Sequence, residues 1–195
     1  MKHKMLTLMI VSALAVGVGF AQGEKKAATA PATASVTATT PQPGELHGGK
    51  LSSTPAGNFE TVFAADGIRI YSYTPDKAPA MMEGTSGSVA LKIAGKKSQT
   101  VALVVEVPAD KEPAVYFCPM HADVVQMTPG MCTKCGGMKL YQQNRLFGKA
   151  DLSQAKPGSV TAEIKIQGLQ GKIKEVSYTV TNAPAEAAAS GQGKR

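Results

Sequence analysis

The chain has 195 residues, a formal net charge of +7, three cysteines and no tryptophan. This length is enough for one sizeable domain or two small ones. The basic excess is modest and scattered, with doublets at Lys25-Lys26, Lys96-Lys97 and Lys194-Arg195. Nucleic-acid binding needs a clustered basic patch with interleaved aromatic residues, so the composition argues against that class of function.

The first 21 residues have the features of a secretory signal peptide. Lys2 and Lys4 precede an apolar run from Met5 to Phe20, and the small residues Gly19 and Ala21 surround a plausible cleavage point. The run is short for a membrane span of about 20 residues, and an uncleaved anchor helix is the alternative. We therefore expect an exported protein, periplasmic or secreted, with no membrane span after signal cleavage.

Two low-complexity segments flank the body of the chain. Residues 22–43 consist largely of Ala, Thr and Pro, and residues 183–195 are similarly poor in large apolar side chains. Neither segment can bury enough area to offset the entropy lost on ordering. The composition predicts a disordered linker and a disordered tail.

The body between them shows the alternation of apolar and polar residues that is typical of β-strands. Turn signals, including the favoured pair Asp66-Gly67, separate the alternating runs. Three hairpins follow from this pattern: residues 58–63 with 68–74, residues 88–93 with 100–107, and residues 160–167 with 176–180. No segment longer than about ten residues shows helical periodicity. An all-β fold is expected.

About seven or eight short strands with regular turn signals predict a β-sandwich. Neither the strands before residue 108 nor those after residue 145 offer enough apolar faces for a core of their own. We therefore expect one split sandwich, formed by residues 44–108 and 145–182, with residues 109–144 inserted at a strand connection. Two independent domains in series are the alternative.

All three cysteines lie in the insert, in two short chelating motifs. Cys118 and His121 form a C-x2-H pair, ten residues follow, and Cys132 and Cys135 form a C-x2-C pair. An odd number of cysteines does not suit a disulfide framework, whereas one tetrahedral metal gives the thiolates and the imidazole a common role. A segment this small, with few large aliphatic residues, also needs a metal or disulfides to fold. The motifs predict a filled four-ligand shell for Zn²⁺ or Cu(I), with no open position for a substrate.

Four methionines, Met120, Met127, Met131 and Met138, lie within or beside these motifs. Thioethers favour soft ions such as Cu(I), so these side chains are candidate auxiliary ligands. Packing around the motifs is the alternative.

The stretch from Tyr116 to Leu140 resembles the small heavy-metal-binding domain found in copper and silver efflux adaptors, metal-exporting P-type ATPases and free-standing exported proteins. The pattern Tyr-x-Cys-Pro-Met-His is matched by residues 116–121, and Pro-Gly-x-Cys-x-x-Cys-Gly by residues 129–136. Ala122 and Thr133 replace prolines of the family pattern, and Gly137 is an extra residue before Met138. The resemblance implies that the metal ligands are Cys118, His121, Cys132 and Cys135. The flanking body is loosely similar to small exported β-sandwich proteins.

These features predict an exported, non-enzymatic heavy-metal-binding protein that holds or passes on copper or zinc. Components of a metal-efflux system are candidate partners. One alternative is a structural zinc ribbon within a β-sandwich interaction protein. Another is a thiol-disulfide pair formed by Cys132 and Cys135, although the sequence lacks the βαβ context in which that pair normally occurs.

Overall fold

The computed structural model describes residues 45–109, 112–169 and 173–183. The predicted signal peptide, the predicted linker and all but the first residue of the predicted tail lie outside these residues. Within the described ranges, no helix has the length and apolar character needed to cross a membrane.

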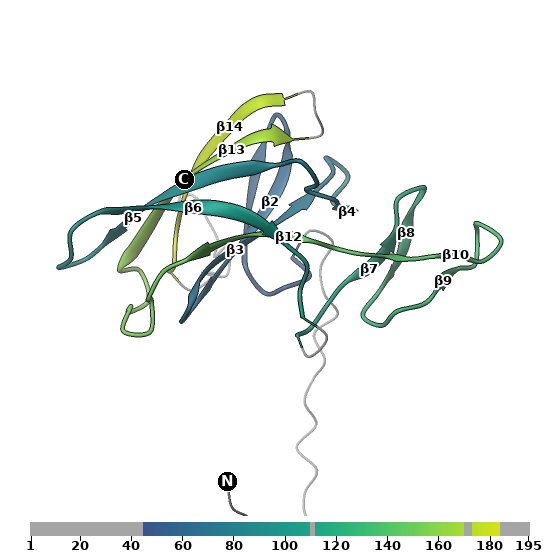
Figure 1. Cartoon of the computed structure of the whole chain (residues 1–195), viewed down its shortest axis with the longest axis horizontal. Coiled ribbons are helices and arrows are strands. Elements are labelled where there is room, and N and C mark those ends of the chain that lie inside the picture. The colour runs from purple at the N-terminus through teal and green to yellow at the C-terminus, as the bar shows by residue number, and fades with distance from the viewer. Residues whose placement is uncertain (1–44, 110–111, 170–172, 184–195) are drawn as a thin grey trace, which may run out of the picture. The chain divides into compact units, whose positions relative to one another are not determined.

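The regular elements in the described part of the chain are all β-strands, as the alternating pattern predicts. Nine of them form one antiparallel sheet (Figure 1). Its order is β1-β2-β3-β12-β6-β5-β13-β14, and β4 pairs with β3 outside this path. The bounds are β1 Lys50–Thr54, β2 Gly57–Ala64, β3 Gly67–Tyr73, β4 Pro79–Ala80, β5 Ser86–Ile93, β6 Gln99–Glu106, β12 Arg145–Lys149, β13 Val160–Leu169 and β14 Ile173–Thr181.

The three predicted hairpins are present as the pairs β2–β3, β5–β6 and β13–β14. The turn of the first hairpin requires glycine for two reasons. Gly67 has a φ of 151°, and a Cβ atom at this position would lie 2.2 Å from the carbonyl oxygen of Gly148 in the neighbouring strand β12. The Asp-Gly pair therefore sets both the turn and the close approach of the next strand.

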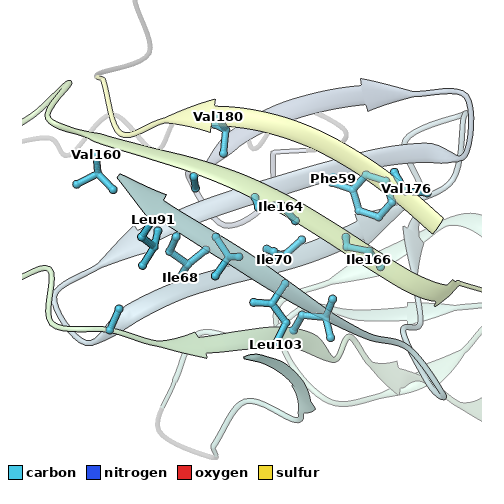
Figure 2. Close-up of a cluster of buried hydrophobic side chains, with 14 of the residues drawn as sticks. Phe59, Ile68, Ile70, Leu91, Leu103, Val160, Ile164, Ile166, Val176 and Val180 are labelled. Carbon is cyan, nitrogen blue, oxygen red and sulfur yellow. The ribbon is translucent and has the colours of Figure 1, made fainter. Parts of the chain in front are cut away.

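The core follows from the alternation. Along β13, Ile164 and Ile166 are buried, whereas Glu163 and Lys165, which alternate with them, are exposed. Figure 2 shows these isoleucines with apolar side chains of other strands: Phe59, Ile68, Ile70, Leu91, Leu103, Val176 and Val180. Each large apolar side chain buried in this way contributes about 1.5–3 kcal/mol relative to exposure.

The sheet is continuous, where the sequence predicts the two sheets of a sandwich. Strand β6 pairs with β5 through Leu103 and with β12 from Val104 onward, so it joins the two halves. The end strands β1 and β14 lie next to each other, and Phe59 of β2 stacks on Tyr178 of β14 with ring centroids 5.4 Å apart. The main sheet is therefore a nearly closed barrel. Alternation of apolar residues is common to sandwiches and barrels, so it could not distinguish them.

The insert forms two small sheets of its own, between β6 and β12. One has the order β11-β7-β8 and the other pairs β10 with β9. The bounds are β7 Tyr116–Cys118, β8 His121–Gln126, β9 Met131–Cys132, β10 Met138–Lys139 and β11 Tyr141–Gln142. Because β12 lies between β3 and β6, strands from both sides of the insert interleave in the main sheet.

A polar run at the end of the insert attaches it to the barrel. The backbone N–H of Gln143 donates to the carbonyl of Val115 at 2.8 Å, and its side-chain amide donates to the carbonyl of Ser72 at 2.8 Å. The side-chain oxygen of Asn144 accepts from the backbone N–H of Met82 at 2.8 Å. Gln143 and Asn144 are buried, and leaving such groups unpaired would cost about 1–3 kcal/mol each. These hydrogen bonds hold the C-terminal end of the insert against the sheet.

Arg145 joins the two ends of the insert by ion pairs. Its guanidinium is buried and lies 2.7 Å from the carboxylate of Glu106, at the end of β6, and 2.6 Å from that of Glu112. It also donates to the hydroxyl of Tyr71 at 3.2 Å. The hydrogen bond from Arg145 holds the pKa of Glu112 below its usual value. The guanidinium of Arg145 thus links the segment that enters the insert to the segment that leaves it.

Candidate metal centre

The first chelating motif is a tight reversal between β7 and β8. Cys118 ends β7, His121 begins β8, and the two residues are partners in the strand pairing, with a register irregularity at Phe117 and Cys118. Residues directly opposite each other on antiparallel strands project to the same face, so both ligand side chains point to the same side. The Sγ atom of Cys118 lies 3.6 Å from Nδ1 of His121.

The second motif is the turn between β9 and β10. Cys132 pairs with Met138 in this short hairpin, and the backbone N–H of Gly137 donates to the carbonyl of Cys132 at 3.2 Å. Gly136 and Gly137 have φ values of 65° and 97°, which other residues rarely adopt. The additional glycine of this sequence therefore takes part in the turn that carries Cys135, and Met138 remains paired beside Cys132.

The two motifs bring four donor atoms to one point. The sulfur atoms of Cys118, Cys132 and Cys135 and a ring nitrogen of His121 all lie within 4.8 Å of one another. Nδ1 of His121 is 3.0 Å from Sγ of Cys135 and 3.6 Å from Sγ of Cys132, and the sulfurs of Cys118 and Cys135 are 3.4 Å apart. Donor atoms on a tetrahedral Zn²⁺, at about 2.0–2.3 Å from the ion, are about 3.3–3.8 Å from one another. Three of these contacts, at 3.4–3.6 Å, have that spacing and the His121–Cys135 contact is slightly shorter at 3.0 Å, so the donor set suits one tetrahedral ion.

The ligands also form the small core of the insert. Cys118 and Cys132 are 2% and 0% exposed and pack with the buried side chain of Leu140. Tyr116, Val124, Cys135 and Met138, all partly buried, pack against them. An insert with so few apolar contacts depends on the bond energy of a bound ion for much of its stability.

The three thiols influence one another's ionisation. Burial opposes ionisation of Cys118, but the backbone N–H of Met120 and the neighbouring thiols stabilise its thiolate, and the net effect is a lowered pKa. Burial raises the pKa of Cys135 to about 12, and its contacts with Cys118 and Cys132 act in the same direction. Since metals bind thiolates, a cation entering the site has to displace protons held there.

An exposed ion pair links the two chelating motifs. Lys134, between the two cysteines of the second motif, pairs with Asp123, two residues beyond His121. Its hydrogen bond lowers the pKa of Asp123. Both side chains are exposed, so the pair adds little stability by itself. Its role is to link the two motifs beside the sulfur cluster.

The four predicted auxiliary methionines fall into two groups. Met138 is half-buried and packs against the sulfur cluster. Met120, Met127 and Met131 are 65%, 48% and 61% exposed. Met120 and Met131 each adjoin a ligand in the sequence, whereas Met127 follows the end of β8 that lies away from His121. The auxiliary role of the four methionines stays a prediction.

The sequence reasoning missed the polar residues that hold the insert. Gln143, Asn144 and Arg145 form a buried polar group. The ring of His47 stacks on that of Tyr71, with ring centroids 3.4 Å apart. The Nε2 atom of His47 lies 3.1 Å from the side-chain oxygen of Gln143. The one available signal was the uninterrupted polar run Gln-Gln-Asn-Arg between two strand segments.

A scan against protein-family models matches residues 115–142 to the family described as heavy metal binding domain. The match covers both motifs and confirms the resemblance seen in the sequence. The insert is thus a heavy metal binding domain, and its group of three cysteines and one histidine could hold a metal ion. No curated protein and no solved structure matches the chain.

Proposed function

We propose that this chain is an exported, non-enzymatic metal-binding protein that holds a copper or zinc ion and passes it on. The observation that carries the proposal is the convergence of Cys118, His121, Cys132 and Cys135 on one point. Export is supported by the signal-like first 21 residues of the sequence. Three thiolates suit a soft or borderline ion better than a hard one.

The donor count supports binding without catalysis. Catalytic zinc sites commonly have three protein ligands and keep a fourth position for water or substrate, whereas structural and storage sites are closed by four. Here four protein donors surround one point, so a bound ion has its tetrahedral shell filled. The chain would hold the metal and would not use it as a Lewis acid.

The exposure of the centre favours transfer over permanent storage. Cys118 and Cys132 are buried, but His121 and Cys135 are only half-buried. An acceptor protein could therefore approach this side and replace these donors one at a time. The exposed thioethers of Met120 and Met131, each next to a ligand in the sequence, offer soft, weakly binding sulfur atoms to a departing Cu(I). Metal-efflux components are the proposed acceptors.

A structural zinc ribbon is the second candidate, and one observation favours it. The two most buried ligands are also the core of the insert, so the metal would be needed for its fold. The exchange rate of the metal separates the two functions. Transfer of the ion to an excess chelator within minutes supports transport, whereas retention over days with folding lost on ligand removal supports the structural role.

The proposed function is tested by elemental analysis of the protein isolated under mild reduction. We expect one copper or zinc per chain in the parent and none in the double variant Cys132→Ala/Cys135→Ala. Thr133→Ala is the matched control, because Thr133 is an exposed residue between the two cysteines and should bind as the parent does. Equal metal contents in the parent and the double variant would contradict the proposal.

A further inference from the structure

We propose that Cys118 and Cys135 form a disulfide when the centre holds no metal, so that the metal site is also a site of reversible oxidation. Their sulfur atoms are in contact at 3.4 Å, although 17 positions separate the two residues in the sequence. The sequence alone suggests the adjacent cysteines of the C-x2-C motif, Cys132 and Cys135, as the pair. The structure assigns the disulfide to a different pair that joins the two motifs.

Exposure determines which thiol a dissolved oxidant can reach. Cys132 is completely buried and Cys118 is nearly so, whereas Cys135 is half-buried. A dissolved oxidant therefore reaches Cys135. A mixed disulfide at this position is then resolved by a neighbouring sulfur, and the sulfur of Cys118 is in contact with it at 3.4 Å.

The local backbone permits the closure. A disulfide has a sulfur–sulfur bond of about 2.05 Å, so the two atoms have to approach by roughly 1.4 Å. Cys135 precedes Gly136 and Gly137 in an exposed turn, which can adjust. Cys132 is held by its pairing with Met138 in the β9–β10 hairpin and by the hydrogen bond from Gly137 to its carbonyl. The more adjustable of the two cysteines in the second motif is thus the one that joins Cys118.

The reaction is a two-step exchange with a small disulfide such as glutathione disulfide. In the first step the sulfur of Cys135 attacks one sulfur of that disulfide, which breaks its S–S bond and releases one molecule of small thiol. In the second step the sulfur of Cys118 attacks Cys135, the mixed bond breaks, and the second small thiol leaves. The protein gives up two electrons and two protons, and the two released thiols carry them.

Oxidation and metal binding exclude each other at this centre. A Cys118–Cys135 bond removes two of the four donors and leaves only Cys132 and His121, too few to close a tetrahedral shell. Oxidation would then release the ion, and a bound ion would protect the thiols. This release rests on the proposed metal-binding function, whereas the choice of disulfide pair does not.

The test maps the disulfide in the full chain. Reduced, metal-free protein is treated with glutathione disulfide, free thiols are alkylated, and the chain is cut before Asp123 and after Lys134, which places the three cysteines in separate peptides. We expect mass spectrometry to find Cys118 linked to Cys135 and Cys132 alkylated. A Cys132–Cys135 link, an equal mixture of the pairs, or no internal disulfide would each overturn the proposal.

Two serine variants provide the matched comparison. Cys132→Ser should still form the internal disulfide, whereas Cys118→Ser should not; the reverse result would contradict the assignment.

Loading the parent with zinc beforehand should slow oxidation by about tenfold or more, because bound thiolates are weak nucleophiles, and an unchanged rate would refute the protection. Metal content of the reduced parent is measured on the same samples. It tests the proposed function separately from the choice of pair.

Discussion

The Nδ1 atom of His121 lies 3.0 Å from the Sγ atom of Cys135, across 14 positions of sequence. This contact joins the reversal between β7 and β8 to the turn between β9 and β10, so neither motif completes the centre alone. It also indicates that the imidazole faces the sulfur cluster through Nδ1.

Replacement of His121 by alanine should weaken metal binding while the three thiols stay in place. Loss of an outer-shell partner typically costs about 10–100-fold in metal affinity, and loss of a direct ligand should cost at least as much. Competition with a chromophoric chelator measures the change. Thr133→Ala serves as the control, and a His121→Ala affinity equal to that of the control would show that the imidazole is not a ligand.

Removal of the metal should loosen the insert and leave the barrel intact. The ligands Cys118 and Cys132 form the small core of the insert with Leu140, whereas the barrel has a large core that contains no candidate ligand. Amide hydrogen exchange of residues 115–142 should become faster on addition of a chelator and slow again with zinc. Equal acceleration in the barrel strands would contradict this separation.

A cavity in the barrel core should lower the stability of the barrel without weakening metal binding. Ile164→Ala removes a buried side chain and should lower the free energy of unfolding by about 2–5 kcal/mol. Lys165→Ala, at the next and exposed position of β13, should change it by no more than about 0.5 kcal/mol. Denaturant titration gives both values. Metal affinity of the folded Ile164→Ala protein should equal that of the parent, and a large loss would mean that the two parts are coupled.

The ion pair between Arg145 and Glu112 should make the attachment of the insert sensitive to acid. The pKa of Glu112 is lowered in the folded protein from a usual value of 4.5, so the folded state favours the charged carboxylate. The stabilisation is present above about pH 4.5 and is lost as the pH falls through the lowered value. The carboxylate is partly exposed, so the contribution is at most about 1 kcal/mol.

Glu112→Gln should therefore reduce the loss of stability on acidification, as measured by thermal unfolding at several pH values. Glu83→Gln, which changes an exposed carboxylate in the loop between β4 and β5, is the control. If both variants follow the acid profile of the parent, the ion pair contributes nothing measurable.

Much of the fold and the centre could be predicted from local patterns. The hairpin at Asp66-Gly67 and the alternating residues of β13 depend on neighbouring residues, and the structure shows both as predicted. The four-donor group follows from two short motifs whose ligands are each three residues apart. Such features need no knowledge of distant contacts.

Other features depend on contacts between residues far apart in the sequence. The barrel arises because β6 pairs with β5 along one part and with β12 along another, which no local pattern reveals. The buried role of Gln143 likewise depends on Ser72 and Val115, far away along the chain. The contact between the sulfurs of Cys118 and Cys135 is of the same kind.

X-ray absorption at the metal edge of the loaded protein tests the central claim most directly, because it reports the atoms bound to the ion. For a tetrahedral site made by Cys118, His121, Cys132 and Cys135, we predict three sulfur atoms at about 2.3 Å and one nitrogen at about 2.0–2.1 Å for zinc. A shell of oxygen atoms, or one with fewer than three sulfurs, would contradict the claim that these four residues hold the metal.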